Sequence, residues 1–348
     1  MMFTFYVRSI LSVSLFVLIA QQSIAENNYS KHIDSLVKTN SVRPFNGVIL
    51  ITQHEKPVYS KVVGFSNFDK HTLFTLDSRF VIGSISKQIT AVLVLRELDK
   101  NHLELDDPIS IYLPELTQEW KDSVTIKQLL NHTSGIVKET LPLAFSAGTQ
   151  FSYSDFGYEL LRRIIEKSSG KTYETLVSEL FKICKMTNSS YPTKATKKTL
   201  VTAYAKSTDT TMLTENETFK YNYIAAGLLI STANDLIKWN DFLHHGKLFS
   251  DSIYHVMMTE TSLRHHPIWG DVSYGYGIQF THNDGITEYG HSGYIPGYIS
   301  MDFYYPETKT SVVVLENIDW KDYDFTQTFH FENLIRNIVR ESNLVKKK

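Results

Sequence analysis

Apolar positions along the chain divide it into a strand-rich start, a helical middle and a strand-rich end. The segments Gly47–Gln53 and Val58–Phe65 have strand-like composition and flank a turn at residues 54–56. Arg79–Ile82 is a third apolar strand, and it leads directly into the apolar run Ile85–Leu98. Because that run is apolar on almost every helical face, it predicts a helix buried on nearly all sides.

The middle of the chain, from about residue 103 to residue 200, carries helical patterns separated by Gly and Pro, and strand patterns return near the C-terminus. The expected helices, besides the buried one, are Tyr29–Lys38, Thr125–Asn131, Tyr158–Ser168, Tyr173–Cys184, Thr232–His244 and Thr326–Glu341. The expected C-terminal strands are Tyr276–Thr281, Ile286–His291, Tyr298–Tyr305 and Thr310–Glu316, the first two joined by a hairpin turn at Asn283–Gly285.

Strands at both ends with helices between them predict an α/β (α+β) fold. We expect an antiparallel sheet flanked by helices and interrupted by a mostly helical inserted domain. The expected boundaries are residues 26–110 for the first part of the α/β domain, 111–224 for the helical insertion and 225–348 for the second part.

Residues 1–25 have the pattern of a secretory signal peptide. Arg8 is the only charge before Glu26, Ile10–Ala20 is apolar, and residues 23–25 form a small-x-small cleavage site. An uncleaved membrane anchor is the alternative, but the apolar run is short for a span. We therefore expect an exported protein, periplasmic or secreted.

The composition is that of a globular protein with a large core, since 42% of the 348 residues are apolar and 21% are charged. The formal net charge of −2 offers no electrostatic attraction to nucleic acid. One cysteine, Cys184, excludes an internal disulfide, and the pairs His244–His245 and His265–His266 are expected in surface loops. No metal-binding motif is present, so we expect neither a metal nor a cofactor. The sequence leaves the oligomeric state open.

Ser84 and Lys87 stand three residues apart at the start of the buried run. Residues i and i+3 share one helix face, so the two side chains would project together. Burial disfavours the ammonium form of a lysine, and a hydroxyl beside a neutral lysine is an activated nucleophile. Alone, this S-x-x-K pattern is weak, because an ordinary helix start with a lysine that reaches solvent explains it better.

Two further motifs follow in order. Tyr153-Ser154-Asp155 precedes an expected helix, and His291-Ser292-Gly293 ends an expected strand. The order along the chain is therefore S-x-x-K, then a Y-x-N-like motif, then H-x-G.

These motifs resemble those of the serine β-lactamase and penicillin-binding-protein superfamily, in particular its class C β-lactamase, DD-peptidase and esterase branch. Residues 129–135 (LLNHTSG) and 225–236 (AAGLLISTANDL) resemble two more segments of that branch. The resemblance runs from about Phe45 to Asn317 and implies a β-lactamase/transpeptidase-like fold. His132, in the first of these segments, is expected to hold a loop rather than to take part in the chemistry.

The resemblance also implies roles for single residues. Ser84 would attack a carbonyl and form an acyl-enzyme, and Lys87 and Tyr153 would share the proton transfers. Backbone N–H groups of Ser84 and Tyr294 would form the oxyanion hole.

The third motif would bind substrate. Gly293 is small enough for substrate to lie against the strand edge, next to Ser292. His291 stands where β-lactamases usually have lysine, so it is expected to offer a weaker, pH-dependent positive charge to a substrate carboxylate. An H-x-G motif is typical of the DD-peptidase and esterase members.

Asp155 departs from the asparagine that is commoner at its position. A carboxylate cannot donate a hydrogen bond to a substrate carbonyl, and a carboxylate near Lys87 would favour the ammonium form of that lysine. More of the general-base work would then fall to Tyr153, or Asp155 would bind a substrate amine. A neutral substitution explains Asp155 about equally well.

We therefore expect an exported serine hydrolase that acts on an amide or an ester through an acyl-enzyme. The substrate would be a small molecule or a peptidoglycan-derived fragment, such as a D-Ala-D-Ala end, a D-amino-acid peptide or a small ester, with only weak activity on β-lactams. The alternative is a catalytically impaired member that binds cell-wall fragments or a protein partner.

Overall fold

The computed structural model describes residues 28–39, 43–206, 212–214, 219, 222–320 and 324–346. The expected signal peptide, residues 1–25, lies outside the described residues. Within them, no helix has both the length and the apolar character that crossing a membrane requires.

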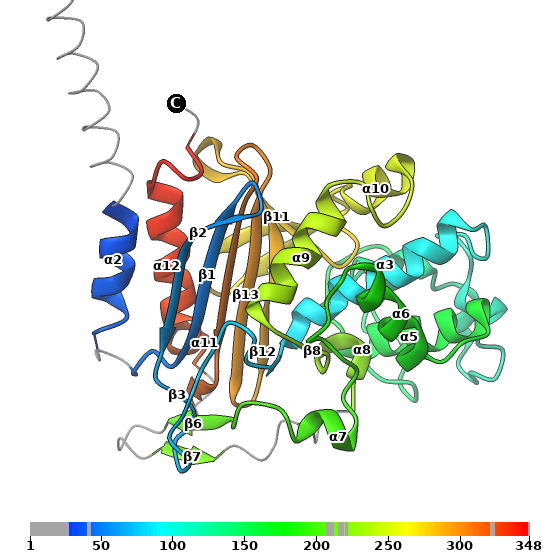
Figure 1. Cartoon of the computed structure of the whole chain (residues 1–348). Coiled ribbons are helices and arrows are strands. Elements are labelled where there is room, and N and C mark those ends of the chain that lie inside the picture. Colours follow the sequence, from blue (N-terminus) through cyan, green and yellow to red (C-terminus); the bar gives the residue numbers. More distant parts are fainter. Residues whose placement is uncertain are drawn as a thin grey trace, which may run out of the picture.

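An antiparallel sheet of eight strands forms the centre of the fold, in the order β2-β1-β14-β13-β12-β11-β10-β9 (Figure 1). Its strands are β1 (Gly47–Gln53), β2 (Lys56–Val63), β9 (Ser262–His266), β10 (Gly270–Tyr274), β11 (Gln279–Thr281), β12 (Glu288–Ile295), β13 (Tyr298–Tyr305) and β14 (Thr310–Glu316). β1 pairs with β14, with Gly47 opposite Glu316 and Gln53 opposite Thr310. The two ends of the chain thus share one sheet, and the predicted fold class is confirmed.

Helices cover both faces of this sheet. The described helices are α2 (Asn28–Leu36), α3 (Ser86–Asp99), α4 (Ile126–Leu130), α5 (Asp155–Ser169), α6 (Tyr173–Ile183), α7 (Lys194–Lys197), α8 (Ile224–Gly227), α9 (Ala233–His244), α10 (Asp251–Met257), α11 (Phe325–Thr328) and α12 (His330–Glu341). α2 and α12 cover one face, while α9, α3 and the rest of the helical region lie on the other (Figure 1).

Alternate side chains of the central strands enter two different cores. On β1, Val48 and Leu50 pack with the helical region that contains α3, whereas Ile49 and Ile51 pack with α2 and α12. Because both faces of β1 are buried, its sequence is a continuous apolar run rather than an alternating one.

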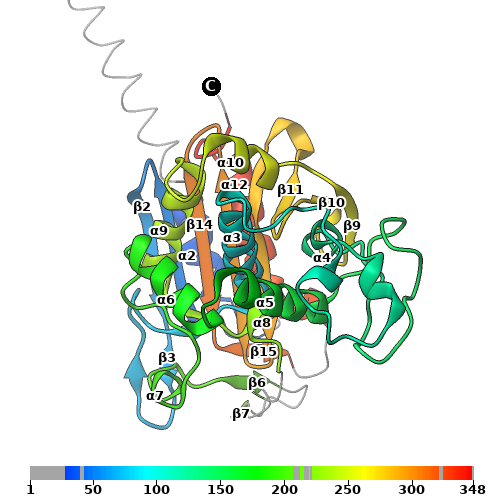
Figure 2. The same cartoon turned by 90° about the vertical axis from the view of Figure 1, so that its right-hand side faces the viewer.

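The other short strands among the described residues form three small sheets. They are β3 (Phe65–Asn67) with β4 (Thr72–Leu73), β5 (Phe80–Val81) with β8 (Ile230–Ser231), and β6 (Tyr204–Lys206) with β7 (Met212–Thr214) and β15 (Ile318–Trp320). The β5–β8 pair leads directly into α3 on one side and follows α8 on the other. Figure 2, which looks onto the helical side, shows α3, α5 and α8 close together.

Several element boundaries differ from the expected ones. The expected strand Val58–Phe65 is divided at Gly64, whose φ of +79° breaks the extended backbone. The expected strand Tyr276–Thr281 is shortened because Gly277 passes over α3 so closely that a Cβ there would lie 2.8 Å from the carbonyl oxygen of Lys87. The expected helix Thr326–Glu341 is divided at Phe329 into α11 and α12.

Asp302 makes the stability of this fold depend on pH. It lies on β13 opposite His291, is buried, and accepts a hydrogen bond from Asn240 Nδ2 at 2.7 Å. Burial raises the pKa of Asp302 from 3.8 to about 7. Between these two values the unfolded chain loses a proton that the folded chain keeps, so Asp302 lowers the free energy of unfolding as the pH rises.

We expect Asp302→Asn to remove this part of the pH dependence, because the amide is neutral at every pH and keeps an oxygen for Asn240. Urea unfolding of both proteins from pH 4 to pH 8 measures it. The variant should gain stability relative to the native protein as the pH rises toward 7. If the free energy of unfolding changed with pH in the same way in both proteins, the prediction would be contradicted.

Candidate active site

Ser84 lies on a 3₁₀ turn, η1 (Gly83–Ile85), between β5 and α3. This turn sits directly against β12, and two glycines make the approach possible. A Cβ on Gly83, whose φ is +52°, would lie 2.6 Å from the backbone nitrogen of Tyr294, and one on Gly293 would lie 2.2 Å from the carbonyl oxygen of Ile82. The close packing holds the turn that carries Ser84 against the backbone of Gly293 and Tyr294.

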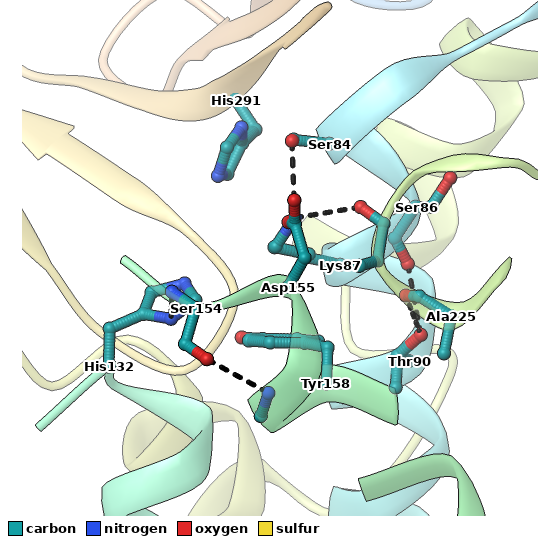
Figure 3. A network of polar contacts seen from close by, with 12 residues as sticks. Ser84, Ser86, Lys87, Thr90, His132, Ser154, Asp155, Tyr158, Ala225 and His291 are labelled. Atoms are coloured by element: carbon teal, nitrogen blue, oxygen red, sulfur yellow. Dashed lines mark hydrogen bonds and ion pairs between the residues drawn. The ribbon is translucent and has the colours of Figure 1, made fainter. Parts of the chain in front are cut away.

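Lys87 is completely buried and is held by three acceptors (Figure 3). Its Nζ donates to Ser84 Oγ at 3.2 Å, to Asp155 Oδ1 at 2.7 Å and to the carbonyl oxygen of Ala226 at 2.8 Å. An ammonium group has three N–H donors and no acceptor, so all three protons are engaged.

The charge of Lys87 follows from these neighbours. Burial lowers the pKa of Lys87, but the Asp155 carboxylate and Tyr153 outweigh it and raise the pKa above its ordinary value. The lysine is therefore an ammonium group. The sequence left open whether the Asp155 carboxylate lies close enough to Lys87 to keep the lysine charged. In the structure it does.

The local sequence explains how Asp155 reaches this position. Ser154 caps α5, because its Oγ accepts from the backbone N–H of Gly157 at 3.0 Å. Asp155 is the first residue of the helix, where the helix dipole favours a negative charge. His132 Nδ1 accepts from the backbone N–H of Ser154 at 3.1 Å, so His132 holds this turn, as expected.

A chain of hydrogen bonds links the second and third motifs. Tyr274, on β10, has its hydroxyl 3.3 Å from His132 Nε2 and 3.1 Å from His291 Nε2. Since Nδ1 of His132 accepts from Ser154, its Nε2 carries the proton and donates to Tyr274. Nδ1 of His291 donates to the carbonyl oxygen of Ser292, so its Nε2 accepts from Tyr274.

His291 therefore differs from its expected role. It is buried, and burial together with the charges of Arg264 and Lys87 holds the pKa of His291 well below its usual range. Burial, with the same two cations, also keeps the pKa of His132 well below the usual range. Both rings are neutral, so the expectation that His291 offers positive charge to a substrate is wrong.

Arg264 supplies positive charge at the site and was not expected from the sequence. Its Cζ lies 4.5 Å from the ring centroid of Tyr153, and Lys87 Nζ lies 4.6 Å from the same centroid. The alternation of β9 places Arg264 and His266 on one face. The alternation is visible in the sequence, but we predicted that His265 and His266 lie in a surface loop. That prediction is wrong, because both residues lie in β9 and His266 is buried.

Two hollows meet at Ser84. The Tyr223 hollow, of about 230 Å³, and the Arg264 hollow, of about 220 Å³, share Ser84, Asp155, Tyr294 and Phe325. The Tyr223 hollow adds Tyr223, Ala226, Gly227, Ile295 and Pro296. The Arg264 hollow adds Tyr153, Arg264, His266, Pro267, His291, Ser292 and Phe329. Gly293 packs against η1 and lines neither.

A possible metal-ligand set lies among other residues. In the described part of the chain, one group, Glu55, Asp241 and His245, brings ligand atoms within 4.8 Å of one another. Its members already have partners, since Lys247 pairs with Asp241, and His245 Nδ1 lies 2.6 Å from Asp241 Oδ1. None of the three lines either hollow at Ser84.

Comparison with known proteins identifies the family. The β-lactamase family model matches residues 34–331, so the chain belongs to the β-lactamase family. The Bacillus subtilis protein PbpX, named for penicillin binding, is 26% identical over 292 residues, which cover 79% of this chain and 71% of PbpX. The teichoic acid D-alanine hydrolase of Staphylococcus aureus is 28% identical over 267 residues, which cover 71% of this chain and 65% of that protein.

Solved structures of similar fold agree. The octameric penicillin-binding protein homologue from Pyrococcus abyssi superposes with a TM-score of 0.77 at 25% identity, covering 90% of this chain and 79% of that one. The D-amino acid amidase from Ochrobactrum anthropi has a TM-score of 0.77 at 18% identity, covering 90% and 99% of the two chains. The predicted resemblance to β-lactamases and penicillin-binding proteins is thus confirmed.

We expect Tyr274→Phe to destabilise the protein by about 1–3 kcal/mol, because the buried nitrogens of His132 and His291 lose their common partner. Urea unfolding measures this loss. Tyr276→Phe is the matched control, since the hydroxyl of Tyr276 takes no part in the chain, and it should cost less. Equal stability of the two variants would show that the hydrogen bonds of Tyr274 with His132 and His291 contribute nothing to the free energy of unfolding.

Proposed function

We propose that this protein is a serine hydrolase that cleaves esters or amides of an acyl group with a free amine, with D-alanyl esters as the preferred class. The observation that carries the proposal is the position of Asp155. Its side chain is 43% exposed, it lines both hollows next to Ser84, and only its Oδ1 is engaged by Lys87. A carboxylate oxygen that faces a hollow is an acceptor for a substrate ammonium group.

The comparisons support this choice of substrate. The staphylococcal relative is named as a hydrolase of D-alanine on teichoic acid, and a D-alanyl ester carries a free amine beside its carbonyl. The family to which the chain belongs supports hydrolysis in general.

The proposed reaction proceeds through Ser84. Its Oγ bonds to the substrate carbonyl carbon while its proton passes to the oxygen of Tyr153, and Tyr153 passes its own hydroxyl proton to the departing oxygen or nitrogen as the bond to the leaving group breaks. Water then hydrolyses the acyl-enzyme by the reverse relay: its proton passes to Tyr153, and the hydroxyl proton of Tyr153 returns to Ser84 Oγ.

Tyr153 is assigned this role because Lys87 is charged and all of its protons are engaged. Lys87 and Arg264 also place positive charge beside the phenol ring, an arrangement suited to a tyrosine that accepts a proton. Lys87 keeps a separate role in this proposal, since its contact with Ser84 Oγ stabilises negative charge that develops there.

Export remains part of the proposal and rests on the pattern of residues 1–25. The alternative function, a catalytically impaired protein that binds cell-wall fragments or a partner, differs in one measurable respect, namely covalent reaction at Ser84.

We expect Ser84→Ala to abolish labelling by a fluorophosphonate and hydrolysis of a D-alanyl ester, because no other group replaces the nucleophile. Mass spectrometry of the native protein should find the adduct on Ser84. Ser292→Ala, a serine in the same hollow, should still be labelled. Labelling that survives in Ser84→Ala would exclude the mechanism, and no labelling of the native protein would favour the binding alternative.

We expect Asp155→Asn to discriminate between substrates by their amine. Turnover of a D-alanyl ester should fall about tenfold or more relative to its N-acetyl counterpart, since loss of a charge-assisted hydrogen bond affects only the charged substrate. Steady-state kinetics on the two esters with the native and variant proteins measure the ratio. An unchanged ratio would show that Asp155 does not bind the amine.

A further inference from the structure

Thr90 lies on α3 three residues after Lys87, and both side chains meet the end of α8 (Figure 3). Thr90 is completely buried, and its Oγ1 donates to the carbonyl oxygen of Ala225 at 2.6 Å. Lys87 Nζ donates to the carbonyl oxygen of the next residue, Ala226, at 2.8 Å. Residues i and i+3 share one face of a helix, so these two contacts are neighbours. α3 therefore holds two consecutive carbonyl groups of α8.

The way in which α8 ends makes both carbonyl oxygens available. The backbone N–H of Leu229 would continue the helix by donating to Ala225, but it donates to Ser86 Oγ at 3.2 Å. The backbone N–H of Ile230 would donate to Ala226, but it donates to a carbonyl oxygen in the loop before α7. The last carbonyl groups of a helix need partners from outside the helix, and a cation is favourable there. A hydroxyl and an ammonium group of α3 supply these partners.

Tyr173, on α6, fixes the direction of the Thr90 hydroxyl. The two side-chain oxygens lie 2.7 Å apart, and both side chains are buried. Burial is the main influence on the pKa of Tyr173 and raises it, so the phenol keeps its proton. A threonine hydroxyl has one proton, and the carbonyl oxygen of Ser86, at 3.2 Å, is a more distant acceptor than that of Ala225. Since the Thr90 proton goes to Ala225, the Thr90 oxygen accepts from Tyr173.

The position of Ala226 matters to the site because Lys87 has no spare partner. The three protons of its ammonium group are used by Ser84, Asp155 and Ala226. A shift of Ala226 would leave one proton of a buried ammonium group without an acceptor, which is costly. The ammonium group would then turn toward its two remaining acceptors, and its contact with Ser84 Oγ would change.

We propose that Thr90 is a positioning residue for the reaction at Ser84. Its hydroxyl, oriented by Tyr173, holds the end of α8 where the Ala226 carbonyl meets Lys87. Thr90 lines neither hollow at Ser84, so it acts on the reaction through Lys87. The inference rests on the proposed function for its effect on turnover, whereas the contact of Lys87 can be measured without any reaction.

Steady-state kinetics on a D-alanyl ester test the effect on turnover. Thr90→Val keeps the shape of the side chain and removes the hydroxyl. We expect kcat to fall about tenfold or more, with a smaller change in KM, because the contact of Lys87 with Ser84 Oγ acts on charge that develops during the reaction. Thr90→Ser keeps the hydroxyl and should restore most of the turnover. Tyr173→Phe should lie between the two, since Thr90 keeps its proton but loses the group that orients it.

Thr281→Val is the matched control. Thr281 is buried, donates to Glu288 Oε1 at 2.9 Å and lines neither hollow, so this variant loses a buried hydroxyl away from the site. In urea unfolding it should lose stability, as Thr90→Val does, but it should keep the native kcat. A fall in kcat of the same size in both valine variants would overturn the inference, because lost stability would then explain it.

The exchange of the Lys87 ammonium protons with water tests the contact directly, by NMR of protein labelled with isotopic lysine. The native ammonium group is buried with all three protons engaged, so its exchange should be slow. In Thr90→Val exchange should be about tenfold faster or more, because one hydrogen bond of a charged group is weakened. In Thr281→Val it should keep the native rate. The signal is identified by its absence in Lys87→Arg.

Failure of this inference can be told apart from failure of the proposed function. An unchanged exchange rate in Thr90→Val would overturn the inference whatever the kinetics show, and faster exchange with the native kcat would overturn the effect on turnover. If the native protein hydrolyses no ester, faster exchange in Thr90→Val but not in Thr281→Val supports the positioning of Lys87, and only the proposed function fails. If Thr90→Val does not fold, Tyr173→Phe decides by the same two measurements.

Discussion

The buried ammonium group of Lys87 is the constraint on which the site depends. A charge that is fully removed from water must be paired and hydrogen-bonded, or it loses its proton. Lys87 meets this requirement with one carboxylate and two neutral oxygens, which come from α5, α8 and η1. The amine of Lys87 needs three acceptors, and this need brings together Ser84, Asp155 at the end of the Tyr153 motif, and Ala226 in α8.

A charged Lys87 changes how work is divided among the other residues. Since Lys87 has no acceptor for a proton, proton transfer passes to Tyr153 in the proposed mechanism. Burial, together with the cations Lys87 and Arg264, lowers the pKa of the nearby histidines, so His132 and His291 act as neutral links of a hydrogen-bonded chain. Besides Lys87, positive charge at the site comes from Arg264, on β9 at the edge of the sheet.

Elements whose signal is local were predicted well. The bounds of Gly47–Gln53, Tyr298–Tyr305 and Thr310–Glu316 match the structure because long apolar runs between turns determine them. The hairpin β9–β10 was missed, because its strands, SLRHH and GDVSY, are mostly polar and contain few of the apolar residues that indicate a strand. Breaks at Gly64 and Gly277 were missed as well, since nothing in the neighbouring residues shows that the chain must turn or approach α3 there.

The sequence by itself determined the family resemblance, the sheet with its helical covering, and the pairing of Ser84 with Lys87, because spacing along one helix places two side chains on one face. Only the tertiary structure decided the charges of the site. Whether Lys87 is an ammonium group, whether His291 is neutral and whether Arg264 faces the nucleophile all depend on burial and on neighbours distant in sequence. A protonation state is set by the surroundings of a group in space, and no local pattern of residues contains them.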